Sequence, residues 1–240
     1  MTNPLNNSRF FSFGFLAMSK YLQEFAVQRA KAILDFWFGK TDEQLLYYDI
    51  CEDRQQVWFR GGDEVDKEIR EKFGEDLVRA DSEEYASLLD DPNPRYRLAL
   101  IILWDQFPRN MFRKDAKAFA WDAKAFALSK QLVSSSLDKK LRPIERVFAY
   151  LPFEHQENLQ SQSESLRLFQ DIKTEASKMS DEASKEKFTE FADKLLSYAK
   201  LHYDIIARFG RFPHRNQYFG RETTEEEKQF LQDESKRFGQ

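Results

Sequence analysis

Two segments of the chain concentrate side chains that could bind a ligand. Residues 103–113 read Leu-Trp-Asp-Gln-Phe-Pro-Arg-Asn-Met-Phe-Arg, and residues 208–221 contain a second Phe-Pro that is followed, after one inserted residue, by Arg-Asn. The second segment holds four arginines and one histidine but no acidic residue, although the whole chain has a net charge of -4. Guanidinium groups bind carboxylates and phosphates through paired donors. The pattern therefore predicts an anion-binding site whose contacts come from Arg109, Asn110, Arg113, Arg211, His214, Arg215 and Asn216.

A third segment, residues 150–157, could supply acid–base chemistry. It reads Tyr-Leu-Pro-Phe-Glu-His-Gln-Glu, and a neutral imidazole beside a carboxylate can exchange protons near pH 7. The catalytic candidates are His155 or His214 as the general base, with Asp105 or Glu154 orienting it. Arginines would then stabilise developing negative charge. A metal-independent enzyme, for example a hydrolase, is therefore the alternative to a binding module.

Each of these patterns also has a purely structural explanation. Arg or Asn just beyond a helix that proline interrupts can hydrogen-bond its terminal carbonyl groups. An acidic residue near a helix start is favoured by the helix dipole. Asp105 and Arg109, four residues apart, could form a helix-surface pair worth only about 0.3–0.5 kcal/mol. In this second alternative the polar motifs hold helices in register.

Several other classes of site are not indicated. The chain has three histidines and one cysteine, Cys51, but neither a His-Glu-x-x-His motif nor a Cys-x-x-Cys pair. P-loop, Gly-x-Gly-x-x-Gly and Gly-x-Ser-x-Gly motifs are missing too. We therefore expect no metal and no cofactor.

Charge and hydropathy limit the partners. With 37 basic and 41 acidic residues the chain offers no global field for nucleic acid. No apolar run approaches the roughly 18 residues that span a bilayer. The expected partner is an unknown anionic small molecule or acidic peptide, with no nucleic acid and no membrane span. A single cysteine fits a reducing compartment, so we expect a cytoplasmic location.

The elements that must position these residues are predicted to be helices. Glycine and proline together number 15 among 240 residues, roughly half of their usual share. Apolar positions recur at helical spacing, and they indicate helices over 21–38, around Val65–Leu77, over 82–90 and from Pro143 to about Tyr150. A buried helix over 98–104 should end or kink at Pro108, and 153–209 should form a helical hairpin with a polar middle at 173–187.

Two apolar stripes are predicted to face the core. One consists of Phe112, Ala116, Phe119, Ala123 and Phe126 on a single helix, and the other of Leu195, Ala199, His202, Ile206 and Phe209. Phe107 and Phe212 should anchor the two Phe-Pro turns, and Thr224 should begin a capped helix. The fold class is all-α, a single-domain array of about eight to ten helices.

The first residues form a separate segment. No acidic residue precedes Glu24, while Arg9 and an apolar stretch over 10–17 are present. Residues 1–17 are therefore predicted to be a flexible leader or a targeting segment, before a single helical domain over 18–240. If they are a presequence, the location would be mitochondrial or another organelle. Translation from Met18 is the alternative start.

Four strings resemble a bacterial-type family, domain of unknown function 924. They are Ile-Leu-Asp-Phe-Trp-Phe at 33–38, the segment 103–113, Leu-Pro-Phe-Glu-His-Gln-Glu at 151–157 and Arg-Phe-Gly-Arg-Phe-Pro-His-Arg-Asn at 208–216. The resemblance covers roughly residues 28–238 and implies an all-helical, tetratricopeptide-like fold. It supplies no catalytic residue, because the family's activity is not established. In a helical array, residues remote in sequence can line one concave face, so we expect the three polar segments to converge.

Overall fold

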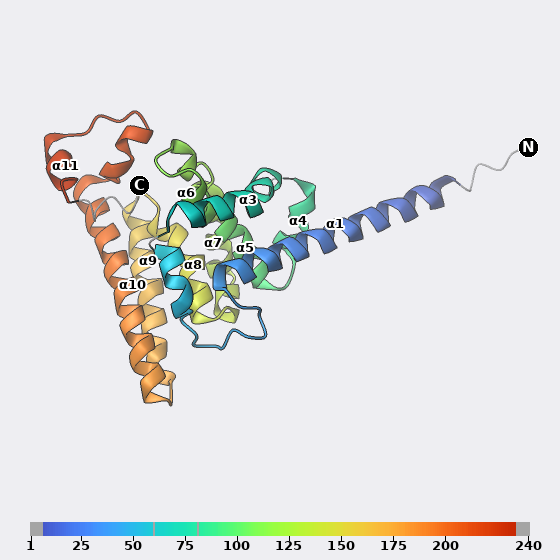
Figure 1. Cartoon of the computed structure of the whole chain (residues 1–240), viewed down its shortest axis with the longest axis horizontal. Helices are drawn as coiled ribbons and strands as arrows, with labels where there is room; N and C mark the ends of the chain where they lie inside the picture. The colour runs from blue at the N-terminus through green and yellow to red at the C-terminus, as the bar shows by residue number, and fades with distance from the viewer. Residues whose placement is uncertain (1–6, 60, 81, 234–240) are drawn as a thin grey trace, which may run out of the picture.

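The computed structural model describes residues 7–59, 61–80 and 82–233, and over these residues all regular secondary structure is helical (Figure 1). This confirms the all-α prediction. Eleven α-helices are present in this part of the chain, three of them with only five or six residues, against the eight to ten predicted. They are α1 (Asn7–Phe38), α2 (Gln55–Phe59), α3 (Asp63–Arg79), α4 (Glu83–Asp90), α5 (Pro94–Ile101), α6 (Phe107–Met111), α7 (Asp122–Ser134), α8 (Pro143–Glu154), α9 (Leu159–Thr174), α10 (Glu182–Phe209) and α11 (Glu225–Phe230).

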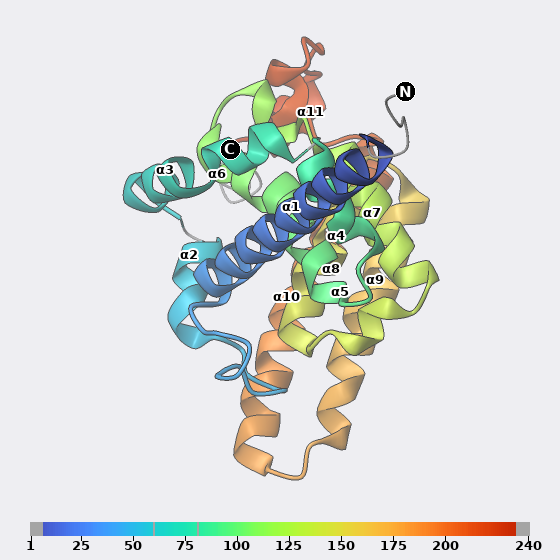
Figure 2. The same cartoon turned by 90° about the vertical axis from the view of Figure 1, so that its right-hand side faces the viewer.

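The helices pack mainly against their neighbours in the chain. From α7 onward, α7 packs on α8, α8 on α9, and α9 on α10, while α1 lies against α4 and α5. Figure 2 shows α1 crossing the body diagonally and the α9–α10 hairpin extending beyond it. The hairpin confirms the prediction for 153–209. The tetratricopeptide-like arrangement stays a prediction.

The predicted leader falls partly outside the described residues. Residues 1–6 lie outside them, and residues 7–17 form the first part of α1. Their role as a leader or targeting segment, and the single domain over 18–240, stay predictions. No helix in the described part of the chain is both long enough and apolar enough to cross a membrane.

Aromatic rings fill the centre of the core. Trp37 of α1 contacts Phe107 and Phe148, with ring centroids 5.7 and 5.3 Å apart, and all three side chains are completely buried. Both contacts have the edge-to-face geometry that aromatic quadrupoles favour. Because Phe107 and Phe212 are both wholly buried, the prediction that they anchor the Phe-Pro turns is confirmed.

The buried helix over 98–104 is confirmed, but Pro108 does not end it. The chain continues from α5 through a π-helical turn at Ile102–Gln106 directly into α6, where Pro108 is one of the first residues. A proline cannot donate a backbone hydrogen bond and clashes with the preceding turn of an α-helix. The wider π-helical turn accommodates it, and such turns often occur at functional sites. Asp105 and Gln106 lie on this turn and are buried.

The first apolar stripe was predicted wrongly. Lys114 has a φ of 61°, Asp115 caps a short 3₁₀ turn at Ala116–Phe119, and α7 begins only at Asp122. Ala116 and Ala123 are exposed, because the helical spacing from Phe112 to Phe126 runs across these breaks. The second stripe is confirmed on α10, where Leu195, Ala199, His202 and Ile206 are buried and Phe209 is partly buried. The capped helix is also confirmed, since Thr224 and Glu227 form a reciprocal capping box at α11.

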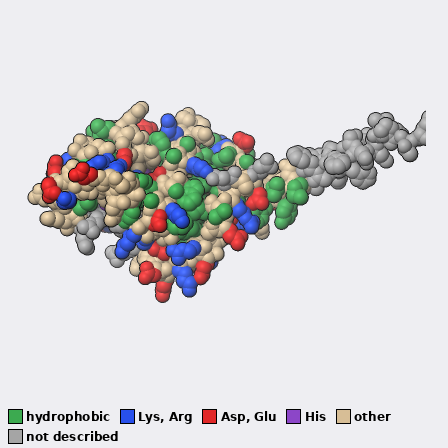
Figure 3. All heavy atoms as spheres, turned by 90° about the horizontal axis from the view of Figure 1, so that it is seen from above, with side chains coloured by type: hydrophobic (Ala, Val, Ile, Leu, Met, Phe, Trp, Pro, Cys, Tyr) green, Lys and Arg blue, Asp and Glu red, His purple; other side chains and the backbone are tan. Residues whose placement is uncertain are grey.

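Charged side chains of both signs are interspersed on the face of the molecule in Figure 3. The net charge therefore does not gather into a patch of one sign on that face.

Replacing Phe107 with alanine should lower the free energy of unfolding by about 3–5 kcal/mol, because it removes a wholly buried ring and leaves a cavity. Urea denaturation followed by circular dichroism measures this change. The control is Tyr198→Ala on α10, where the side chain is 55% exposed, and its effect should stay within about 0.5 kcal/mol. Equal stability of the two variants would contradict the central position of Phe107.

Candidate functional site

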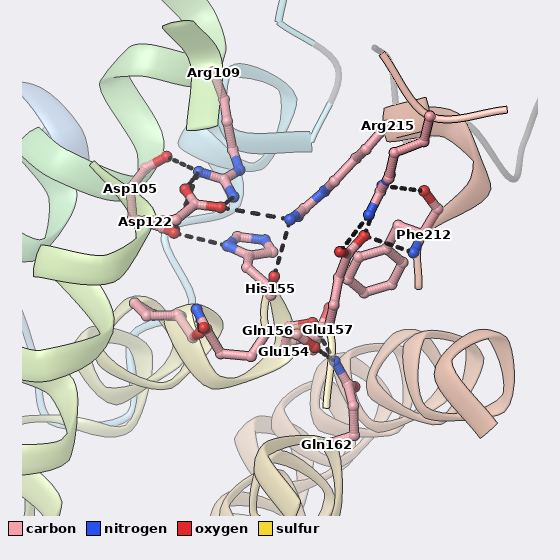
Figure 4. A network of polar contacts seen from close by, with 12 residues as sticks. Asp105, Arg109, Asp122, Glu154, His155, Gln156, Glu157, Gln162, Phe212 and Arg215 are labelled. Atoms are coloured by element: carbon pink, nitrogen blue, oxygen red, sulfur yellow. Dashed lines mark hydrogen bonds and ion pairs between the residues drawn. The ribbon is translucent and has the colours of Figure 1, made fainter. Parts of the chain in front are cut away.

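Part of each predicted polar segment meets at one place, drawn in Figure 4. The π-helical turn contributes Asp105, the following turn Arg109, the end of α8 His155, and a 3₁₀ helix at Pro213–Tyr218 contributes Arg215. Asp122 of α7, which no sequence pattern indicated, joins them. We call Arg109, Asp122 and Arg215 the arginine bridge, and Asp105 with His155 the Asp–His pair.

The Asp–His pair joins a wholly buried carboxylate to a partly buried imidazole. Oδ1 of Asp105 lies 2.7 Å from Nδ1 of His155, and its Oδ2 accepts a hydrogen bond from Gln106. Burial alone would raise the pKa of Asp105, but the charge of Arg109 and the contact with His155 bring it down to about 2. An ionised carboxylate can only accept a hydrogen bond. His155 must therefore carry its proton on Nδ1 and donate it to Asp105.

His155 is held as a neutral base. Burial, and after it the positive charge of Arg109, keep the pKa of His155 below its ordinary value despite the neighbouring Asp105. With Nδ1 donating, the other ring nitrogen, Nε2, carries a lone pair at pH 7. The side chain is 13% exposed, so the imidazole is not sealed inside the core.

The arginine bridge centres on the carboxylate of Asp122 (Figure 4). Arg109 donates from Nη1 and Nη2 to the two carboxylate oxygens at 2.8 and 3.0 Å, a bidentate pair. Arg109 also donates to the backbone oxygen of Asp105 at 2.7 Å. On the other side, Nη1 of Arg215 lies 3.6 Å from Oδ2 of Asp122, which is an ion pair without a hydrogen bond.

Arg215 is the less completely paired of the two arginines. Its guanidinium lies between the rings of Phe119 and Phe212, 4.6 Å from each centroid, and Nη1 donates to the backbone oxygen of His155 at 3.1 Å. Its Nε is buried and has no hydrogen-bond partner among the described residues. Burial, reinforced by the charge of Arg109, lowers the pKa of Arg215 to about 10 although Asp122 opposes this. Arg215 is therefore a buried cation without a hydrogen bond to a carboxylate.

Two other predicted ligand contacts, Asn110 and Arg113, point to a different place. Asn110 Nδ2 donates to Oδ1 of Asp66 at 2.8 Å, and Arg113 Nη2 donates to the same oxygen at 3.0 Å. Asp66 belongs to α3, so these contacts join α3 to α6.

Arg211 and Asn216 likewise bind a carboxylate of the protein. Arg211 donates to Glu227 from Nε at 2.7 Å and from Nη2 at 2.9 Å, and Asn216 donates to Oε2 of Glu227 at 3.2 Å. Hydrogen bonds from Arg211 are the main reason why the pKa of Glu227 falls to about 2. Both residues thereby attach α11 to the segment after α10.

Glu154 orients neither His155 nor His214. Its Oε1 lies 3.0 Å from Nδ1 of His202, a residue that the sequence placed in the core. His214 is buried, and burial together with the charge of Arg215 lowers its pKa to about 2. The three histidines and Phe212 nonetheless form a chain of ring contacts, with centroids 6.4 Å apart for His155 and His202, 5.5 Å for His202 and Phe212, and 5.6 Å for Phe212 and His214.

The acidic partners were not predicted from the sequence. Asp66, Asp122, Glu157 and Glu227 all lie outside the two Phe-Pro motifs. Glu157 accepts from Arg221 at 2.7 and 3.0 Å and from the backbone nitrogen of Phe212 at 2.8 Å. The one available signal was the surplus of arginine over 208–221, because buried arginines require carboxylates from elsewhere in the chain.

Two hollows among the described residues lie away from the bridge. One of about 540 Å³ lies between α9 and α10 around Leu166 and Leu196, and one of about 710 Å³ lies along α1 around Tyr21 and Phe25. No bridge residue lines either of them. Among the described residues no group of three or more His, Cys, Asp or Glu side chains could hold a metal ion.

Comparison with known proteins identifies relatives without a known activity. A family model described as a bacterial protein of unknown function (DUF924) matches residues 33–235. The solved structure of a protein of unknown function from Agrobacterium tumefaciens is similar, with a TM-score of 0.67 and 31% sequence identity, covering 85% of this chain and 97% of that one. No curated protein sequence matches the chain.

The buried His214 should make the protein labile to acid. The unfolded state takes up a proton near pH 6.5, whereas the folded state resists it down to about pH 2. Stability is therefore fully present above pH 6.5 and is lost as the pH falls, by about 1 kcal/mol per pH unit for one such group. Urea denaturation between pH 7.5 and 5 should show this slope, and His214→Gln should make it shallower by one proton. An unchanged slope would contradict the assignment.

Proposed function

This chain belongs to the DUF924 family of bacterial proteins of unknown function, and we propose that it binds a small anionic ligand at the arginine bridge. The ligand is a small molecule or an acidic group of a peptide. The single observation that carries the proposal is the incomplete pairing of Arg215. Its side chain is buried and positively charged, but its contact with a carboxylate oxygen is an ion pair at 3.6 Å and not a hydrogen bond.

An anion at this position would relieve an electrostatic cost. Removing a guanidinium from water is unfavourable unless hydrogen bonds and negative charge replace the lost hydration. Arg109 already has both oxygens of Asp122, while Arg215 has one backbone oxygen and two aromatic faces. The exposed edges of Arg109 and Asp122, 14% each, show that the bridge reaches the surface. A ligand can therefore approach without unfolding the core.

The neighbouring predicted contacts have structural roles in this proposal. Asn110 and Arg113 are committed to Asp66, and Arg211 and Asn216 to Glu227. Releasing these side chains would give up hydrogen bonds to ionised carboxylates, which a weakly held ligand does not replace. We assign them to holding helices in register. We further infer a cytoplasmic location, because the buried Cys51 is unpaired.

Binding should appear as a rise in melting temperature when acetate or sulfate is added at constant ionic strength. An anion at one hundred times its Kd would stabilise the fold by about 2.7 kcal/mol. For a domain of this size that corresponds to roughly 5–10 °C. Arg215→Gln should lose most of this shift, because it removes the incompletely paired charge.

The matched control is Arg208→Gln, which removes an arginine that is 54% exposed and pairs with Glu226 outside the site. It should respond to both anions as the wild type does. The proposal fails if neither anion raises the melting temperature of the wild type, or if Arg215→Gln responds fully.

A second candidate function, a metal-independent enzyme that uses acid–base chemistry, is favoured by the Asp–His pair. The 2.7 Å contact between Asp105 and His155 fixes the tautomer and leaves Nε2 as a base. This is the arrangement that orients a histidine in Ser-His-Asp enzymes, here without a neighbouring nucleophile among its described contacts. The arginine bridge would then hold the substrate's charge.

The tautomer of His155 can be measured directly. Long-range ¹H–¹⁵N NMR at pH 7 should show a neutral ring protonated on Nδ1, because the ionised Asp105 can only accept. Asp105→Asn should abolish this preference, since an amide can present a donor to the same nitrogen. A ring protonated on Nε2 in the wild type would exclude His155 as a base at that atom.

A further inference from the structure

Asp122 already fills the position that a ligand's charged group would take at the arginine bridge. Its two oxygens accept the two parallel hydrogen bonds of Arg109, at 2.8 and 3.0 Å, and its Oδ2 faces Nη1 of Arg215. Asp122 lies at the first turn of α7, outside the Phe-Pro motifs that supply the arginines. The protein thus places a carboxylate of its own between the two guanidinium groups.

The net charge at the bridge stays the same if one monoanion replaces the carboxylate of Asp122. The ionised groups around it are Arg109 and Arg215 against Asp105 and Asp122, with Glu157 nearby and paired with Arg221, and His155 is neutral. Replacing the carboxylate of Asp122 with another carboxylate keeps this balance, whereas a dianion adds an uncompensated charge to a buried site. In the low-dielectric surroundings of a buried site, an uncompensated charge costs more free energy than it does in water.

The two guanidinium groups present their edges to the position of the ligand. The central carbon of the Arg215 guanidinium lies 4.6 Å from the ring centroid of Phe119 and 4.6 Å from that of Phe212. The rings cover the faces of the guanidinium, so its edge remains for hydrogen bonds. Arg109 also offers its edge, as its bidentate contact with Asp122 shows. A carboxylate matches such an edge, as Asp122 itself shows. A tetrahedral oxyanion can also accept two donors from one arginine, so the preference for a carboxylate rests on its single negative charge.

Asp122 is the acidic residue in the first turn of α7, where the helix dipole favours a carboxylate, but a second contact also holds the start of the helix. The residue that precedes the helix is Trp121, whose ring stacks on Phe112 at a centroid distance of 6.1 Å. Asp122 itself is partly exposed, at 14%, so its side chain can rotate towards solvent while Trp121 keeps the helix in position.

The geometry points to a carboxylate ligand that displaces Asp122, which acts as an internal competitor at its own binding site. This inference rests on the proposed function and adds the chemical class of the ligand. Displacement leaves Arg109 and Arg215 on the ligand and turns Asp122 to solvent. In the absence of ligand, Asp122 therefore closes the bridge. It lowers the affinity of the bridge for every anion that must displace it.

The test compares acetate, a planar monoanion, with sulfate, a tetrahedral dianion, by calorimetry at pH 7 and constant ionic strength. Asp122→Ser should bind acetate at least tenfold more tightly than the wild type, because the competitor is gone. Sulfate should bind this variant more weakly than acetate does, because its second negative charge is uncompensated in the site. Asp122→Asn is the second variant, since its amide keeps the size of the side chain and a hydrogen-bond acceptor if the serine variant does not fold. Asp204→Asn is the control, because it removes a carboxylate that is 54% exposed and pairs with Lys200.

The outcomes separate this inference from the proposed function. Sulfate binding to Asp122→Ser as tightly as acetate would overturn the carboxylate class. If the wild type binds anions through Arg215 but removal of Asp122 brings no gain, Asp122 is not a competitor and the proposed function stands alone. If no variant and no wild-type protein binds either anion, both fail. A gain in Asp204→Asn as large as in Asp122→Ser would also overturn the inference, because it would reflect net charge alone.

Discussion

The carboxylate of Asp105 has no exposed surface, so other parts of the chain must supply its hydrogen-bond donors and positive charge. Its position follows from Pro108, since the π-helical turn that accommodates the proline is the turn that carries Asp105 inward. His155 then joins the end of α8 to that turn, and Arg109 joins it to α7 through Asp122. Removing one member of such a buried set leaves a charge unpaired, which typically costs about 3–5 kcal/mol. The register of these elements therefore depends on one buried charge.

Complete and incomplete pairing separate structural arginines from the candidate site. Arg211 has both oxygens of Glu227 and a backbone carbonyl, and Arg113 shares Asp66 with an asparagine. Arg215 has neither a bidentate carboxylate nor a partner for Nε among the described residues. The Nε atoms of Arg146 and Arg221 are also buried without a partner, but each of these arginines donates a hydrogen bond to a carboxylate, and Arg215 has only the 3.6 Å ion pair. The difference in pairing, more than the number of arginines, distinguishes the bridge.

Local features of the chain were predictable because they depend on residues close in sequence. The helix that ends at Gly39, the proline start of α8 and the capping box at Thr224 each follow from a few adjacent side chains. The stripe from Phe112 to Phe126 failed for the same reason, since Asp115 caps a new turn inside it and local capping interrupts a longer period. Most of the arginines and asparagines of the candidate clusters were identified, because their excess is visible in the sequence. Asp66, Asp122 and Glu227 were not, since tertiary packing alone brings them into contact.

The two Phe-Pro motifs have equivalent roles although their local structures differ. Phe107 and Phe212 are buried anchors, and Arg109 and Arg215 both reach Asp122. The following asparagines, Asn110 and Asn216, each donate to a carboxylate that also binds a further arginine. The repeat is therefore a repeat of contacts, and it explains why similar residues recur in a π-to-α-helical segment and in a 3₁₀ helix. The second motif carries one extra residue, His214. Nη1 of its arginine, Arg215, lies 3.6 Å from Oδ2 of the shared carboxylate and makes no hydrogen bond to it. Equivalent motifs with unequal contacts to Asp122 are what a site needs if one arginine is to hold the protein's own carboxylate and the other is to attract a ligand's.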